Sequence, residues 1–172
     1  DPDDAAAEQT LRLIVHTSAG GDSVRIRLSN THGNGPLTVG AVSIAVQSEG
    51  SSIRSASSAD LSFSGQASVT IPRGGVVFSD PLSYSVPAMT NLSVSLYLPN
   101  DSGFLTAHAL SNEINYAAAG GDQTQSMNLE NATETPAWPL LTAIDVINGD
   151  SLSAIAMVGD SITDGWGSTA GA

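Results

Sequence analysis

The sequence predicts a mainly β protein, with an antiparallel β-sandwich of jelly-roll type over residues 1–147 and the first βα unit of an α/β domain over 148–172. Three observations carry this prediction. Short apolar runs recur at intervals of roughly 8–14 residues, separated by turns rich in Gly, Pro and Asn. Helical periodicity is almost absent. Near the end of the chain, the apolar run 154–158 stops at Gly159, which is typical of a strand buried on both faces.

The predicted sandwich strands follow one another from residue 11 to about residue 146. They are expected at 11–15, 24–28, 37–46, 61–63, 69–71, 76–78, 92–98, 104–110 and 140–146. The clearest alternation places Leu92, Val94, Leu96 and Leu98 on one face, opposite Ser93, Ser95 and Tyr97. This period of two predicts a strand with one buried face and one solvated face. Residues 48–58 are serine-rich and are expected to form a loop or a weak edge.

Residues 117–139 interrupt the strand pattern and are expected to form a long polar loop. A loop of this length in a compact domain is usually functional or mobile. Within it, Trp138 is expected to plug the sandwich, with stacking on a sugar ring as the alternative. The turn residues Asn148-Gly149-Asp150 then mark the boundary between the two predicted domains.

Composition limits the classes of partner. Of the 172 residues, 41% are hydrophobic and 13% charged, which allows a sizeable core and disfavours global disorder. The net charge of −12 disfavours nucleic acid and anionic membrane, because both need a basic surface. The chain has no cysteine, hence no disulfide framework or thiolate chemistry. No apolar run reaches the ~18 residues of a membrane span, and the sequence indicates no metal and no cofactor.

Three sequons are candidate glycosylation sites, at Asn91, Asn100 and Asn131. Asn100 and Asn131 fall in expected loops, whereas Asn91 opens an expected strand. A chain that starts at Asp1 is expected to have been processed. Together these features predict a secreted glycoprotein that acts on neutral substrates.

The tripeptide Gly-Asp-Ser occurs three times, at 21–23, 149–151 and 159–161, and context separates the copies. The first leads into an alternating strand and the second lies in a turn-rich segment. Only the third follows a buried apolar run, so Ser161 is expected where the chain leaves a sheet for a helix. There its hydroxyl would be exposed, beside the unpaired N–H groups at the start of that helix. A nucleophile and donors for an oxyanion are two parts that acyl transfer needs.

The segment Gly159-Asp160-Ser161-Ile162-Thr163 resembles the first sequence block of the SGNH, or GDSL, hydrolases. The resemblance implies an esterase built on a flavodoxin-like sheet, with Ser161 as nucleophile and its N–H as an oxyanion donor. Gly159 and Asp160 would support the turn, while Thr163 and Asp164 would cap the helix that follows. The β-rich half is similar to the N-terminal region of a multidomain subgroup of this family. That similarity rests on residues 25–30, 35–40, 79–81 and 92–99.

The family's catalytic base is a histidine three residues after an aspartate, and no histidine of this chain fits that pattern. The residues three positions before His16, His32 and His108 are leucine, serine and leucine. Each histidine is therefore expected to be an ordinary strand or turn residue. A serine hydroxyl is a poor nucleophile until a base takes its proton. We therefore expect the chain to be the N-terminal portion of a longer hydrolase, with the remainder either missing here or present as a second chain after proteolytic processing.

The function predicted from the sequence is hydrolysis of a carboxylic ester, such as an acylated carbohydrate or lipid, through an acyl-enzyme on Ser161. The catalytic His and Asp would come from the C-terminal part. Two alternatives remain open. The sandwich could be a carbohydrate-binding module, or a structural module that accompanies a separate catalytic chain.

Overall fold

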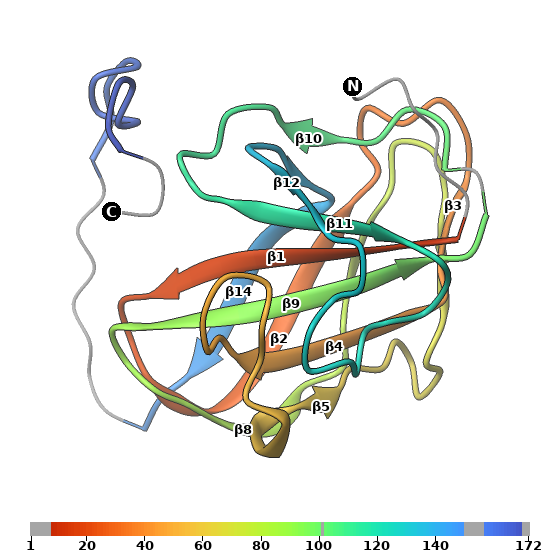
Figure 1. Ribbon diagram of the computed structural model, residues 1–172, viewed down its shortest axis with the longest axis horizontal. Coiled ribbons are helices and arrows are strands. Elements are labelled where there is room, and N and C mark those ends of the chain that lie inside the picture. The colour runs from red at the N-terminus through yellow and green to blue at the C-terminus, as the bar shows by residue number, and fades with distance from the viewer. Residues whose placement is uncertain (1–7, 101, 150–156, 170–172) are drawn as a thin grey trace.

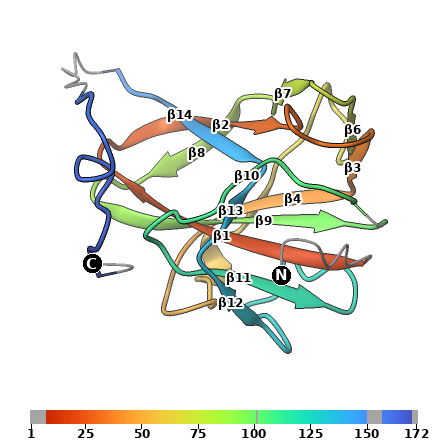
Figure 2. The same ribbon diagram turned by 90° about the horizontal axis from the view of Figure 1, so that it is seen from above.

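The computed structural model describes residues 8–100, 102–149 and 157–169. The protein is mainly β, with antiparallel sheets arranged in two layers (Figures 1 and 2). Figure 2 views the layers edge-on, with β2, β8 and β14 in one and β1, β9 and β11 in the other. Within the described part of the chain, no helix is long and apolar enough to cross a membrane.

The larger sheet has six strands in the order β12-β11-β1-β9-β4-β5. Their bounds are Thr133–Thr135, Asn115–Ala119, Gln9–Thr17, Thr90–Leu98, Ala41–Val46 and Ala59–Asp60. The central pair, β1 and β9, is antiparallel over its whole length, from Gln9 opposite Leu98 to Thr17 opposite Thr90.

The smaller sheet runs β14-β2-β7, and β8 also pairs with β2. These strands are Leu141–Ile147, Gly21–Ser29, Val76–Phe78 and Leu82–Val86. Two short ladders complete the fold: β3 with β6, and β10 with β13. Their bounds are Leu37–Val39, Val69–Ile71, Ala107–His108 and Trp138–Pro139, and one 3-10 turn, η1, spans Ser55–Ser57.

One hydrophobic core joins the facing sides of the two sheets. The four side chains of β9 that the alternation placed on one face are fully buried: Leu92, Val94, Leu96 and Leu98. Val24, Ile26 and Leu28 of β2 belong to the same cluster. Each such side chain contributes about 1.5–3 kcal/mol when it leaves water. The period-two pattern thus predicted the inward face of these strands correctly.

The outward face of β9 differs from the expectation of a solvated surface. Ser93 and Ser95 are each only 1% exposed, because the segment 120–132 lies over this side of the larger sheet. A second, smaller apolar cluster forms there, built on Ile14, Tyr116 and Leu129. Residues 120–132, which were expected to form a polar loop, therefore cover one face of the larger sheet.

Several predicted boundaries were wrong. Residues 117–139 are not one loop, since β11 extends to Ala119 and both β12 and β13 lie within the range. The expected strand 61–63 is reduced to a single bridge between Phe63 and Gln66. The expected strand 37–46 divides into β3 and β4 at Gly40, where an added Cβ would approach the Tyr97 ring to 2.9 Å. Strand β8 falls at a segment for which no strand was predicted.

Candidate functional site

Ser161 lies in an exposed turn held by local hydrogen bonds. The Asp160 carboxylate accepts a bond from the Ile162 N–H at 3.0 Å, and the Asp160 carbonyl accepts one from the Asp164 N–H at 3.1 Å. The Trp166 N–H donates to the Ser161 carbonyl at 2.7 Å. Asp160 thus closes an Asx-type turn around the serine. Residues 161–167 form turns, so the helix that Thr163 and Asp164 were expected to cap is not seen in the described residues.

Glycines bound the turn on both sides. At Gly159 an added Cβ would overlap Thr163 Oγ1, so a larger residue would displace the threonine. Gly165 has φ +90°, a conformation that side-chain-bearing residues rarely adopt. These two positions explain why the segment folds back on itself within so few residues.

The strand expected before the turn is not formed in its described part. Met157 and Val158 are 80% and 98% exposed and belong to no strand, while 154–156 lie outside the described residues. Ile162 and Trp166 are also largely exposed. Four large apolar side chains within five residues of Ser161 are therefore largely exposed.

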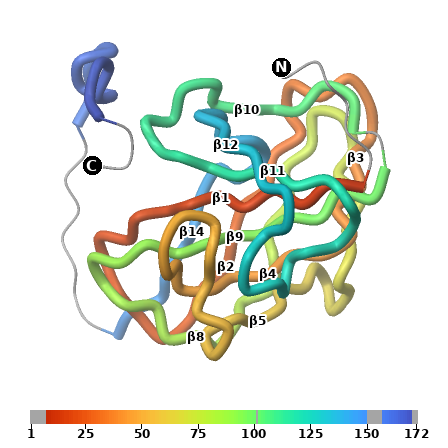
Figure 3. The backbone as a smooth tube through the Cα atoms, in the orientation of Figure 1, coloured from red at the N-terminus to blue at the C-terminus, as the bar shows by residue number. Residues whose placement is uncertain are grey.

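The turn contacts the β-layers through Asn112, which donates from Nδ2 to the Asp164 carbonyl at 3.0 Å. Asn112 belongs to the loop between β10 and β11, which reaches toward the turn in Figure 3. Ser161 Oγ makes no hydrogen bond with any residue in 8–100, 102–149 or 157–169. Among the described residues, the hydroxyl therefore has no partner that could activate it.

The three histidines lie on the β-layers. His16 Nδ1 is 2.8 Å from Asn91 Oδ1, across the β1–β9 pair. His32 donates its backbone N–H to Thr106 Oγ1 in the turn after β2. His108 lies in β10, opposite Trp138 of β13. Within the described residues none of them is hydrogen-bonded to Ser161.

The other Gly-Asp-Ser copies and the sequons also have defined places. Gly21 opens β2, whereas most of the copy at 149–151 lies outside the described residues. The Asn91 amide is engaged at both ends, since its Nδ2 donates to Gln47 Oε1 at 2.8 Å. Asn100 and Asn131 are exposed. Among the sequons, these two present free side chains for a glycan.

Arg12 is a residue whose importance the sequence analysis missed. Its side chain is 0% exposed and lies under the 120–132 segment. Nε donates to Ser95 Oγ at 2.9 Å, and the two Nη atoms donate to the carbonyls of Ser51, Gln123 and Ser126 at 2.6, 3.2 and 2.9 Å. Burial lowers the pKa of Arg12 to about 10. The only available signal was a lone arginine inside the apolar strand Leu11–Val15.

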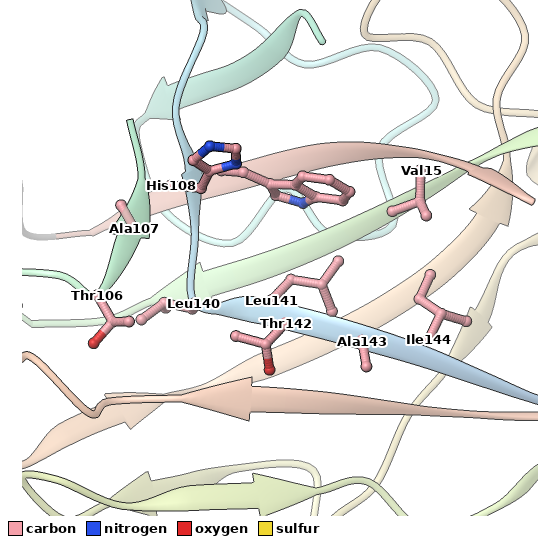
Figure 4. Close-up of a pocket in the computed structure, with 10 residues that line it drawn as sticks. Val15, Thr106, Ala107, His108, Leu140, Leu141, Thr142, Ala143 and Ile144 are labelled. Atoms are coloured by element: carbon pink, nitrogen blue, oxygen red, sulfur yellow. The ribbon is translucent and has the colours of Figure 1, made fainter. Parts of the chain in front are cut away.

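Trp138 has a second role besides plugging the core. It packs against the main cluster, as expected, and also lines a cavity of about 310 Å³. Val15 of β1 and Leu141 to Ile144 of β14 form other walls, so the cavity lies where the two sheets separate (Figure 4). No sequence pattern indicated it, because its walls come from four strands.

Comparison of the sequence with models of protein families finds no match, and comparison with curated proteins finds none either. Among the described residues, no group of three or more His, Cys, Asp or Glu side chains could hold a metal ion.

Proposed function

We propose that the chain is part of a serine ester hydrolase of the GDSL type, with Ser161 as the nucleophile. The observation that carries the proposal is the exposed turn around Ser161, fixed by Asp160 and by the close approach of Thr163 to Gly159. The Ser161 N–H has no acceptor among the described residues, so it is available to an oxyanion.

In the proposed reaction, Ser161 Oγ attacks the ester carbonyl carbon while its proton passes to a base. The tetrahedral intermediate then expels the alcohol, which takes that proton, and leaves an acyl-enzyme. Water releases the acid by the same steps. Since the described histidines lie elsewhere, the base and its aspartate are proposed to come from residues outside these 172, carried on a second chain.

The exposed apolar side chains near Ser161 support an active site that is shared between this chain and a second one. Met157, Val158, Ile162 and Trp166 expose far more apolar surface than a solvated turn needs. Met157 and Val158 are proposed to join a flavodoxin-like sheet that the remainder of the hydrolase completes. The β-layers are proposed to be the jelly-roll sandwich of the multidomain subgroup.

The surface supports a secreted protein with a neutral ester as substrate. A net charge of −12 repels anionic substrates, and an acylated saccharide or lipid ester carries no such charge. Asn100 and Asn131 are exposed, as glycan acceptors on a secreted chain must be.

Labelling of the native protein with a fluorophosphonate tests the proposal. We expect the probe to modify Ser161 and the Ser161→Ala variant to remain unlabelled. Ser23→Ala is a matched control, because Ser23 ends the first Gly-Asp-Ser copy, and this variant should label normally. Labelling at a serine other than Ser161 would contradict the assignment. Absence of any labelling in material that contains an accompanying chain would contradict it as well. Intact mass of the same material identifies that chain.

A further inference from the structure

The cavity beside Trp138 has the construction of a small-molecule site. Its volume of about 310 Å³ lies at the lower end of the range for ligand pockets, about 300–1,000 Å³. Its walls are largely aliphatic, from Val15, Leu140, Leu141 and Ile144. Thr106, His108 and Thr142 add polar side chains to the lining, which contains no Asp, Glu, Lys or Arg. A charged ligand would lose its hydration here and meet no carboxylate, ammonium or guanidinium group in the lining, so the walls favour a neutral, compact ligand with an apolar body.

The wall also contains an unmet hydrogen-bond donor. Trp138 Nε1 is buried and has no partner among the described residues. A buried N–H without an acceptor costs about 1–3 kcal/mol, so an acceptor on a ligand would recover that loss. Nε1 is shielded from solvent, hence a ligand oxygen reaches it only if the indole ring turns within the wall. Binding must therefore change the surroundings of this N–H group.

The backbone of the same wall departs from regular strand geometry. Leu140 is 1% exposed and has φ +65°, which is rare for a residue with a branched side chain. It is held there because its N–H donates to the Thr106 carbonyl and its carbonyl accepts from the Ser29 N–H, at 2.8 and 2.9 Å. The register of β14 with β2 then shifts between Leu141 and Ala143. Strained residues and bulges of this kind concentrate at ligand sites.

We infer that this cavity binds a small neutral carbonyl compound with an apolar body, its oxygen accepting from Trp138 Nε1. The apolar body fills the space between Val15 and Ile144. The site is separate from Ser161, and its occupation does not depend on ester hydrolysis by the chain.

Titration of the 15N-labelled chain with acetophenone tests the inference, because this ketone cannot be hydrolysed. The chain has two tryptophans, and the Trp166→Phe variant assigns the two indole N–H signals. We expect acetophenone to shift the Trp138 signal saturably. α-Methylstyrene, in which CH₂ replaces the carbonyl oxygen, should bind the wild-type chain about tenfold more weakly than acetophenone does. Acetophenone should likewise bind the Trp138→Phe variant about tenfold more weakly than the wild type, as measured from the backbone amide signals.

A second variant guards against loss of folding in the first. Ala143→Leu places a larger side chain in the wall and should abolish binding while the indole signal of Trp138 remains dispersed. Absence of a saturable shift up to the solubility of acetophenone would overturn the inference, as would equal affinity for α-methylstyrene. Tighter binding of methyl glucoside would overturn the ligand class and indicate a saccharide site.

Discussion

Replacing Arg12 by methionine should destabilise the fold far more than the same change at the exposed Arg25. Arg12 makes four hydrogen bonds of 3.2 Å or less, one to Ser95 of β9, one to Ser51 and two to the 120–132 segment. Hydrogen bonds from a charged donor contribute about 1.5–3 kcal/mol each, so four contribute about 6 kcal/mol at the lower end. Methionine keeps the apolar stem of the side chain but none of these bonds.

Relief of desolvation offsets part of this loss. Burial lowers the pKa of Arg12 to about 10, which corresponds to a penalty on the cation of about 3 kcal/mol. The hydrogen bonds outweigh that penalty, and Arg12→Met should therefore lower the free energy of unfolding by about 3 kcal/mol. For a domain of this size the melting temperature should fall by roughly 6–12 °C.

Urea unfolding measures the difference, with Arg25→Met as the matched control. Arg25 pairs with Asp145 at 2.8 Å and lies 4.7 Å from the Phe78 ring centre, but both members of the ion pair are more than 40% exposed. That change should cost under about 1 kcal/mol. Limited proteolysis should also cut 120–132 faster in Arg12→Met. If the free energies of unfolding of the two variants differ by less than about 0.5 kcal/mol, the inference that Arg12 holds the 120–132 segment against the sheet is wrong.

Three further outcomes are expected. The pKa of Asp80 lies below its ordinary 3.8, chiefly because its carboxylate accepts a hydrogen bond from the Gly65 N–H. The ionised carboxylate therefore stabilises the fold fully above pH 3.8, and this stabilisation is lost as the pH falls through the pKa of the folded state. The difference in urea midpoint between wild type and Asp80→Asn should be largest at pH 7 and should disappear in acid. Gly159→Ala should disorder the Ser161 turn, seen in the Trp166 indole signal, while Gly149→Ala, whose added Cβ meets nothing within 4 Å, should not. Glycopeptide mass spectrometry of secreted protein should find glycans at Asn100 and Asn131, and an occupied Asn91 would contradict the pairing of its amide.

The inward faces of the strands were predictable because apolar alternation is a local signal. Burial of Ser93 and Ser95 was not, because it depends on a segment some thirty residues downstream and on one arginine of another strand. Strand β11 was missed for a similar reason: Asn115–Ala119 has little apolar pattern and becomes a strand by pairing with β1. The cavity beside Trp138 could not be found either, since its walls meet only after both sheets have formed.

The hydrogen bonds within the turn at Ser161 are local, because each joins residues at most five apart. The strand and the helix that the sequence predicted on either side of Ser161 are nevertheless not seen in the described residues. The ester hydrolysis proposed for Ser161 requires a distant base and would therefore depend on contacts that local sequence does not specify. Met157 and Ile162, which are exposed and close to Ser161 in the sequence, would contact any chain that brings a base to the turn. A partner surface that covers them would also exclude water from the serine, which strengthens hydrogen bonds to an oxyanion. If the proposed second chain docks here, its docking and the reactivity of Ser161 should appear together, because the same contact would produce both.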